Sequence, residues 1–213
     1  YPVKLITTSN LNAQCGGYMR ITNVKVDMFN WNSSPWQTGA GRIMPVGDTR
    51  QLGIVTVETD VDVIGNAFLG SVRKGADHFV KDLIKFIKPL VMGRDPLDIG
   101  AIWWDMWKMN RLVATDVIGA IDICLWDING KISGQPIHRL LGTCKESVPV
   151  YSSTAYHETP EEYAEEALQF KDKGWTAHKI HPHGEAHSDI RISQAVRDAV
   201  GDQMKLMLDS MWA

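Results

Sequence analysis

Two stretches near the start of the chain alternate between apolar and polar residues. The first runs from Ile21 to Asn30 and the second from Ile54 to Thr59. Successive side chains of a strand point to opposite faces, so this alternation is typical of strands with one buried face. The two stretches therefore predict a β-hairpin near the start of the first domain.

The segment between these stretches, residues 32–41, is rich in turn residues and has Trp36 near its middle. It is longer than a hairpin connection needs, and long loops are either functional or without a fixed structure. Two interpretations stay open, a loop that contacts a ligand and an excursion with no role.

Helical spacing begins further along the chain. Apolar residues recur at steps of three and four from Phe79 to Leu90, which predicts an amphipathic helix that Pro89 and Gly93 end. Three tryptophans continue this spacing, Trp103, Trp104 and Trp107. Aromatic residues can stack on nucleobases, but without interleaved basic residues this spacing favours core or subunit contacts.

A longer segment, Val117 to Ile128, is apolar nearly all round, which is typical of a helix buried on most faces at the centre of a domain. Asp122 and Asp127 interrupt it. A pair of carboxylates could do acid–base chemistry, but five residues apart on a helix these two point in different directions. We expect structural ion pairs for both.

After Gly142 short strands alternate with helices, as in parallel βαβ units. Thr159, Pro160 and Glu162 form a capping-box pattern that predicts a helix start, and Gly174 supplies its stop. A second helix carries apolar residues from Ile192 to Val200. The expected strands are residues 148–152, 177–181 and 204–209.

The second and third expected strands carry candidate chemistry at their carboxyl ends. Lys179 and His181 share one face of their strand, and Asp209 ends the next strand. Parallel α/β folds place their active sites at this end. Histidine titrates near neutrality, so His181 is the better base, and Lys179 would hold a substrate carboxylate. Alternatively, the two bases only satisfy a local hydrogen-bond network and Asp209 caps the next turn.

Other cofactor classes find little support in the sequence. The histidines near this strand could suggest zinc or nickel, but His178 and His181 face opposite sides and His183 and His187 follow a proline. The segment 39–41 lacks the further glycine of a dinucleotide fingerprint and the Gly-Lys-Ser/Thr of a phosphate loop. We expect neither a transition metal nor a nucleotide.

Composition and charge argue against nucleic-acid and membrane partners. The net charge is −3 with both signs intermixed, so no broad positive field favours nucleic acid or a membrane surface. No apolar stretch approaches the roughly 20 residues of a bilayer span, and residues 1–20 lack the order of a secretory signal. The three cysteines are widely spaced. These features predict a soluble protein of the cytoplasm.

Several blocks in a fixed order resemble the mandelate racemase/muconate lactonizing enzyme branch of the enolase superfamily. The blocks are residues 57–59, 87–96, 120–131 and 134–142. The resemblance implies an α/β chain with an α+β capping domain followed by the start of a (β/α)₈ TIM-type barrel. It places an N-terminal extension at residues 1–19, the capping domain at 20–147 and the first three barrel strands and two helices at 148–213.

The resemblance also implies a reaction. Members of the superfamily abstract the proton α to a carboxylate with a Lys or His base, and Mg²⁺ stabilises the enediolate. Asp209 takes the first magnesium-ligand position, and Lys179 and His181 take the places of a Lys-x-Lys pair. The implied partner is a small carboxylate, a hydroxy acid or sugar acid. We expect substrate contacts from Trp36 and Arg42, in a loop that closes over the site, and from Ser153.

Two departures from the family pattern matter. His181 replaces the second lysine, which makes a sugar-acid dehydratase at least as plausible as a racemase or epimerase, and Met211 stands where many relatives have Asn. Three strands cannot close a barrel of eight strands and about 250 residues. We therefore expect the sequence to belong to a longer polypeptide, the alternative being a non-catalytic fragment that needs a partner chain. The tryptophan face would suit a homo-oligomer.

Overall fold

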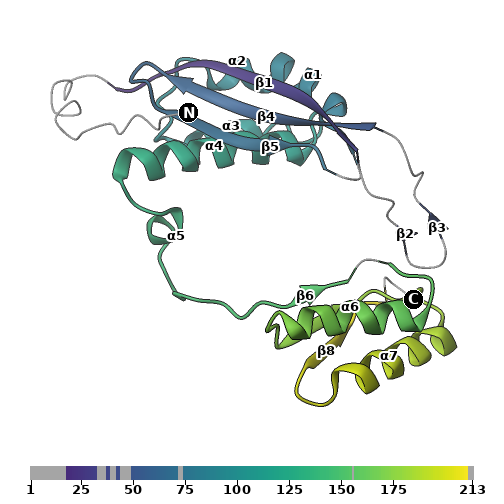
Figure 1. Ribbon diagram of the computed structural model, residues 1–213. Helices are drawn as coiled ribbons and strands as arrows, with labels where there is room; N and C mark the ends of the chain where they lie inside the picture. The colour runs from purple at the N-terminus through teal and green to yellow at the C-terminus, as the bar shows by residue number, and fades with distance from the viewer. Residues whose placement is uncertain are drawn as a thin grey trace. The chain divides into compact units, whose positions relative to one another are not determined.

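The computed structural model describes residues 18–32, 37–38, 42–43, 49–71, 74–154 and 156–210. The chain divides into two compact units. The first contains residues up to 31 and 50–143, and the second contains residues 32–49 and those from 144 onward (Figure 1). Each unit has its own hydrophobic core.

A three-stranded sheet forms one layer of the first unit. Its strands are β1 (Ile21–Asn32), β4 (Thr49–Thr59) and β5 (Ile64–Leu69), in the order β1-β4-β5. The two strands predicted from alternation are therefore neighbours, and β5 is a strand that the sequence analysis missed. β4 and β5 run antiparallel, with Ile54 opposite Phe68 and Val57 opposite Gly65.

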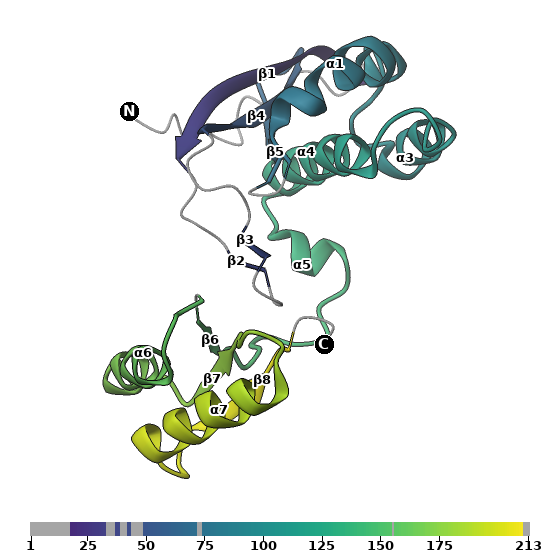
Figure 2. The ribbon, with the colours of Figure 1, turned by 90° about the vertical axis from the view of Figure 1, so that its right-hand side faces the viewer.

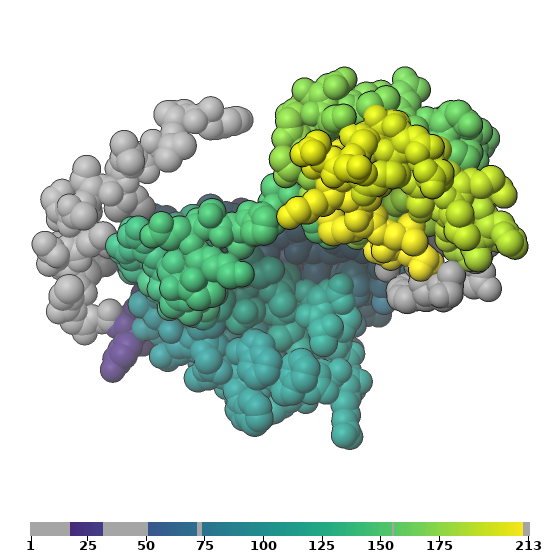
Figure 3. Space-filling model, turned by 90° about the horizontal axis from the view of Figure 1, so that it is seen from below, coloured from purple at the N-terminus to yellow at the C-terminus, as the bar shows by residue number. Residues whose placement is uncertain are grey.

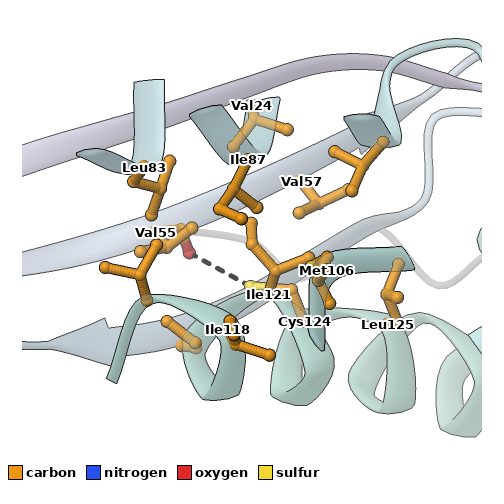
Figure 4. Packing of buried hydrophobic residues seen from close by; sticks show 14 of the residues in the cluster. Val24, Val55, Val57, Leu83, Ile87, Met106, Ile118, Ile121, Cys124 and Leu125 are labelled. Carbon is orange, nitrogen blue, oxygen red and sulfur yellow. Dashed lines mark hydrogen bonds between the residues drawn. The ribbon is translucent and has the colours of Figure 1, made fainter. Parts of the chain in front are cut away.

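The helices of this unit lie along one face of the sheet (Figure 2). Alternate residues of β4, among them Val55 and Val57, are buried against them (Figure 4). Gly65 is needed at the closest approach, because a Cβ atom there would lie 2.0 Å from the carbonyl oxygen of Cys124. The opposite face of the sheet carries exposed side chains such as Phe68.

The segment predicted as a single amphipathic helix, from Phe79 to Leu90, is built from three short pieces: α1 (Val80–Asp82), η3 (Leu83–Ile87) and α2 (Lys88–Val91). A short helix, η2 (Ala76–His78), precedes it. η3 is π-helical, and the N–H of Lys88 donates to the carbonyl of Leu83. Pro89 does not end the helix as predicted. Proline lacks an N–H and clashes with the carbonyl four residues earlier, and the wider π turn accommodates it within α2.

Two further helices complete the unit. α3 (Ile99–Trp107) buries Ile99, Ile102 and Met106, whereas Trp104 is 59% exposed. Trp103 packs against the core and stacks on Trp107 with ring centroids 5.2 Å apart. One of the three tryptophans thus contributes to the core, and a subunit contact through the others stays a prediction.

The long helix α4 (Thr115–Ser133) is the central helix of this unit, and a short helix, α5 (Ile137–Leu140), follows it. α4 is less buried than predicted, because its Ile123 is 54% exposed. Asp127 forms the expected ion pair, with Lys131 at 2.7 Å. Asp122 forms none with the described residues, and burial raises its carboxyl pKa. The ion pair expected for Asp122 therefore stays a prediction.

The second unit contains a parallel sheet covered by two helices. Its strands are β6 (Ser152–Ser153), β7 (Ala177–Ile180) and β8 (Lys205–Leu208), in that order and all parallel. α6 (Pro160–Asp172) and α7 (Ala186–Val200) pack on each other beside the sheet (Figures 1 and 2). The predicted capping box is present at Thr159. β6 is shorter and later than the strand predicted at 148–152.

The segment between β1 and β4 contains a small antiparallel pair, β2 (Gln37–Thr38) and β3 (Arg42–Ile43).

None of the helices in the described part of the chain combines the length and apolar character of a membrane span. The last described residues, drawn in yellow, lie at the surface of the second unit (Figure 3).

Candidate active site

The register of the parallel sheet places polar residues on one face. Ser153 pairs with Lys179, and Lys179 pairs with Met207 on the far side. Their neighbours His178 and Ile180 point to the other face and are buried at the helices. The period of two that predicted these faces is therefore present in the strand pairing.

Three side chains meet at the carboxyl end of this face. The Lys179 ammonium donates to Oδ2 of Asp209 over 3.1 Å, and Nε2 of His181 lies 3.4 Å from the same oxygen. The hydrogen bond to Asp209 raises the pKa of the Lys179 ammonium, while burial acts in the opposite direction. A base, a cation and a carboxylate thus share one site, although their roles stay predictions.

The imidazole of His181 is oriented by the loop after β6. Its Nδ1 lies 3.2 Å from the carbonyl oxygen of Thr154 and 3.5 Å from the hydroxyl of Ser153. A carbonyl oxygen can only accept a hydrogen bond, so the contact with Thr154 is a hydrogen bond when Nδ1 carries the proton. The other nitrogen, Nε2, lies 3.4 Å from the Asp209 carboxylate, and in a neutral ring with its proton on Nδ1 it is the nitrogen that can accept a proton.

Tyr163 of α6 also belongs to this site, although the sequence analysis did not single it out. Its side chain is buried, and its hydroxyl donates to the main-chain carbonyl of His181 over 2.8 Å. Thr154 acts through its carbonyl oxygen, which no residue-type pattern reveals. Tyr163 could have been found from the sequence, because a tyrosine among the apolar positions of a helix is expected to be buried and its hydroxyl then needs a hydrogen-bond partner.

The other predicted substrate contacts have different outcomes. Ser153 lies beside His181, whereas Trp36 lies outside the described residues. Arg42 is in β3, opposite Thr38, but its side chain is not among the parts that the structure describes. Of the neighbouring histidines, His178 contacts Ser152 on the buried face and His183 contacts the carbonyl of His157.

The donor set of this site suits a hard cation only in part. The Asp209 carboxylate offers the kind of oxygen that Mg²⁺ prefers. In residues 18–210, as far as they are described, no three Asp, Glu, His or Cys side chains come together as a metal site. Asp209 can therefore serve as one ligand, and the described residues supply no complete site.

Comparison with known proteins decides the family. Residues 21–142 match the N-terminal domain of the mandelate racemase/muconate lactonizing enzyme family. The chain belongs to this family. The resemblance drawn from the sequence blocks is confirmed, and so is the fold class of a capping domain followed by a parallel strand–helix segment.

Two relatives with assigned names illustrate the similarity. The chain is 28% identical over 204 residues to a D-galactarolactone cycloisomerase of Agrobacterium fabrum, covering 90% of this chain and 52% of that protein. It is 32% identical over 131 residues to a D-mannonate dehydratase of Caulobacter vibrioides, covering 59% of this chain and 32% of that protein.

A solved structure agrees with these relatives. The crystal structure of D-glucarate dehydratase from Agrobacterium tumefaciens complexed with magnesium superposes with a TM-score of 0.74 and 26% sequence identity. It covers 91% of this chain and 54% of the other chain. The chain thus spans only about half the length of such relatives. As a homologue of dehydratases, cycloisomerases, racemases and epimerases, it belongs to an enzyme family.

Proposed function

We propose that the protein containing this chain abstracts the proton α to the carboxylate of a sugar acid or hydroxy acid and eliminates water. The observation that carries the proposal is the convergence of Lys179 and His181 on Asp209 at the carboxyl ends of adjacent parallel strands. The names of the dehydratase relatives support the substrate class.

In this proposal His181 is the base. Its Nδ1–H bond to Thr154 leaves Nε2 to take the proton, and the electron pair of the broken C–H bond passes to the substrate carboxylate. Lys179 stays a cation and binds the substrate carboxylate beside Asp209. Ser153 lines the same face and contributes a hydroxyl.

Asp209 would hold Mg²⁺ through one carboxylate oxygen, and bound Mg²⁺ acts as a Lewis acid on the substrate carboxylate. The described residues offer no second carboxylate at this place. We expect the remaining ligands to come from further strands of the barrel, as the half-length coverage of relatives suggests.

Dehydration is preferred over racemisation for a chemical reason. Racemisation needs bases on both faces of the substrate carbon, whereas dehydration needs one base and an acid for the departing hydroxyl. Replacing the second lysine of the Lys-x-Lys pair with His181 alters the two-lysine arrangement. The acid that protonates the leaving hydroxyl is not assigned to any residue described.

Incubation of the natural full-length protein with sugar acids and Mg²⁺ in D₂O tests the proposal. Proton NMR should show loss of the α-proton together with formation of a 3-deoxy-2-keto acid. His181→Asn and Asp209→Asn should each abolish product formation. Their matched controls are His138→Asn on α5 and Asp198→Asn on α7, which alter exposed residues outside the three strands that carry the site.

A second readout avoids dependence on the right substrate. Mn²⁺ can replace Mg²⁺ as a paramagnetic probe, and its binding should weaken in Asp209→Asn but not in Asp198→Asn. Return of the substrate deuterated at the α-carbon, with no keto acid, would replace the dehydratase with an epimerase. Unchanged turnover in His181→Asn would overturn the assignment of the base.

A further inference from the structure

We propose that Tyr163 is a positioning residue for His181, holding the main chain at the end of β7 so that the imidazole keeps its Nδ1–H bond to Thr154. The proposal rests on the proposed role of His181 as the base. It assigns to Tyr163 a contribution that neither burial nor the relatives' names indicate.

The bond from Tyr163 begins where the sheet no longer restrains the strand. The carbonyl of Ile180 still accepts from the N–H of Asp209 on β8, at 3.0 Å. One residue later, the carbonyl of His181 accepts from the Tyr163 hydroxyl at 2.8 Å. At His181, the main-chain carbonyl is thus bonded by a side chain of α6 instead of by the neighbouring strand.

The ring of Tyr163 is fixed by neighbours from the two loops of the site. It makes edge contacts with His157, at 5.1 Å between centroids, and with His183, at 6.2 Å. Tyr163 is fully buried, so its hydroxyl has little freedom to reach another partner. Burial also raises the pKa of its phenol, which keeps the donor proton in place.

The same two loops are joined by imidazole hydrogen bonds. Nε2 of His183, after β7, donates to the carbonyl of His157, after β6, over 2.8 Å. His157 in turn contacts the carboxylate of Glu166 on α6 at 3.0 Å. We call the bonds Tyr163–His181, His183–His157 and His157–Glu166 the loop clasp. It attaches both loops to α6.

The bond between His181 and Thr154 joins the same two loops, so its length depends on how they are held. At 3.2 Å it is near the upper end of a good hydrogen bond, and a small displacement of either loop would break it. Without that bond, the proton of the neutral ring would no longer be held on Nδ1, and the ring could rotate so that Nε2 no longer faces Asp209. Displacements of about 1 Å at a catalytic group are enough to lower rates severely.

A purely structural role is the competing explanation, in which Tyr163 only fills the core and satisfies one carbonyl. The tautomer of His181 distinguishes this explanation from the positioning role. Long-range ¹H–¹⁵N correlation spectra of the chain labelled with ¹⁵N-histidine, at a fixed pH of about 8 where imidazoles are neutral, report which ring nitrogen is protonated. The spectrum of His181→Asn identifies the His181 signals.

Tyr163→Phe removes one hydroxyl and keeps the ring. We expect His181 to show a predominant Nδ1–H form in the unaltered chain and to lose that predominance in the variant. Lys171→Met is the matched control, because Lys171 also lies on α6 and donates to a main-chain carbonyl, that of Val200, at 2.8 Å. It should leave the His181 signals unchanged.

Unchanged His181 signals in Tyr163→Phe, with a loss of stability like that of Lys171→Met, would overturn the proposal. If Tyr163→Phe does not fold, His183→Ala breaks the clasp at a less buried residue, and unchanged His181 signals there would have the same meaning. The readout needs no substrate. Failure of the dehydratase proposal appears in the turnover assay, and failure of the positioning role appears in the tautomer spectrum.

Discussion

The carboxylate of Asp127 accepts a hydrogen bond from the main-chain N–H of Asn66 at 2.9 Å. Asn66 lies on β5, an edge strand of the capping-domain sheet. Lys131, one turn further along α4, donates to the carbonyl of Ile64 at 2.8 Å and to Asp127 at 2.7 Å. This ion pair therefore satisfies outward main-chain groups of an edge that could otherwise pair with another strand.

Replacing Asp127 should weaken the capping domain more than an ordinary surface pair would. Asp127→Ala leaves the Asn66 N–H without its acceptor, and we expect a loss of about 1–3 kcal/mol in the free energy of unfolding. Urea unfolding measures this loss, and hydrogen exchange of the β5 amides shows whether it is local to that strand. Asp105→Ala is the control, since Asp105 pairs with Arg94 and Lys108 at the surface and bonds no main-chain group among the described contacts. Equal losses in both variants would contradict the account.

The capping box of α6 gives a prediction about the helix that carries Tyr163. Thr159→Ala removes the acceptor for the N–H of Glu162 and should cost about 1 kcal/mol. Thr159→Ser keeps the hydroxyl and should recover most of the loss. Hydrogen exchange of the first turn of α6 provides the measurement, and an unprotected first turn in both variants would assign the effect to packing of the Thr159 methyl group.

His178 predicts acid sensitivity of the second unit. It is buried, its Nδ1 contacts the hydroxyl of Ser152 at 2.8 Å, and its Nε2 has no hydrogen-bond partner among the described residues. Burial lowers the pKa of this imidazole below its ordinary value. The unfolded chain therefore binds the proton more readily, so this stability is present above about pH 6.5 and is lost as the pH falls below it.

Unfolding free energies measured between about pH 8 and about pH 5 test this sign, with a slope of up to about 1.4 kcal/mol per pH unit from one proton. His178→Gln removes the titrating group and should flatten the slope below pH 6.5. His138→Asn, on exposed α5, should leave the slope unchanged. A slope in His178→Gln equal to that of the unaltered chain would assign the pH dependence to other groups.

Two isoleucines on α7 should respond differently to truncation. Ile192 is buried in the core of the second unit, and Ile192→Ala should cost about 2–5 kcal/mol. Ile190, two residues earlier, is 66% exposed, and Ile190→Ala should change stability by less than about 0.5 kcal/mol. Urea midpoints of the two variants compare them directly. A large loss from Ile190→Ala would mean that something covers this face of α7.

The described cysteines should differ in reactivity. Cys124 is buried, its thiol contacts the carbonyl of Val55, and burial raises its pKa to about 12 (Figure 4). Cys144 is exposed. Iodoacetamide followed by peptide mapping should modify Cys144 in the folded chain and Cys124 only after unfolding, because the thiolate is the reactive form. Equal modification in the folded state would require frequent opening of the core.

Periodicity predicted the larger elements and the face of β7 that carries the site, because both follow from side-chain direction along a regular backbone. Lys179, His181 and Asp209 were placed together for that reason. β5 was missed because it is short and contains Gly65 and Asn66, which weaken a strand signal. The π turn at η3 was missed because the local apolar spacing does not report a change of helical pitch.

The partners of His181 could not be predicted in the same way. Thr154 contributes a carbonyl oxygen, which every residue has, and Tyr163 reaches the site from a helix 18 residues earlier. Such contacts depend on tertiary packing, and no local pattern encodes them. The exposure of Ile123 has the same origin, since its burial depends on what covers α4.

The alternation along β7 limits how this site can change during evolution. Inserting or deleting one residue before Lys179 would turn Lys179 and His181 into the helices and expose His178 and Ile180 at the sheet surface. Both the reaction and the core would be lost in one step. Descendants of this sequence can therefore acquire new chemistry here by exchanging side chains at fixed positions, while changes in length are confined to the loops beyond the strand.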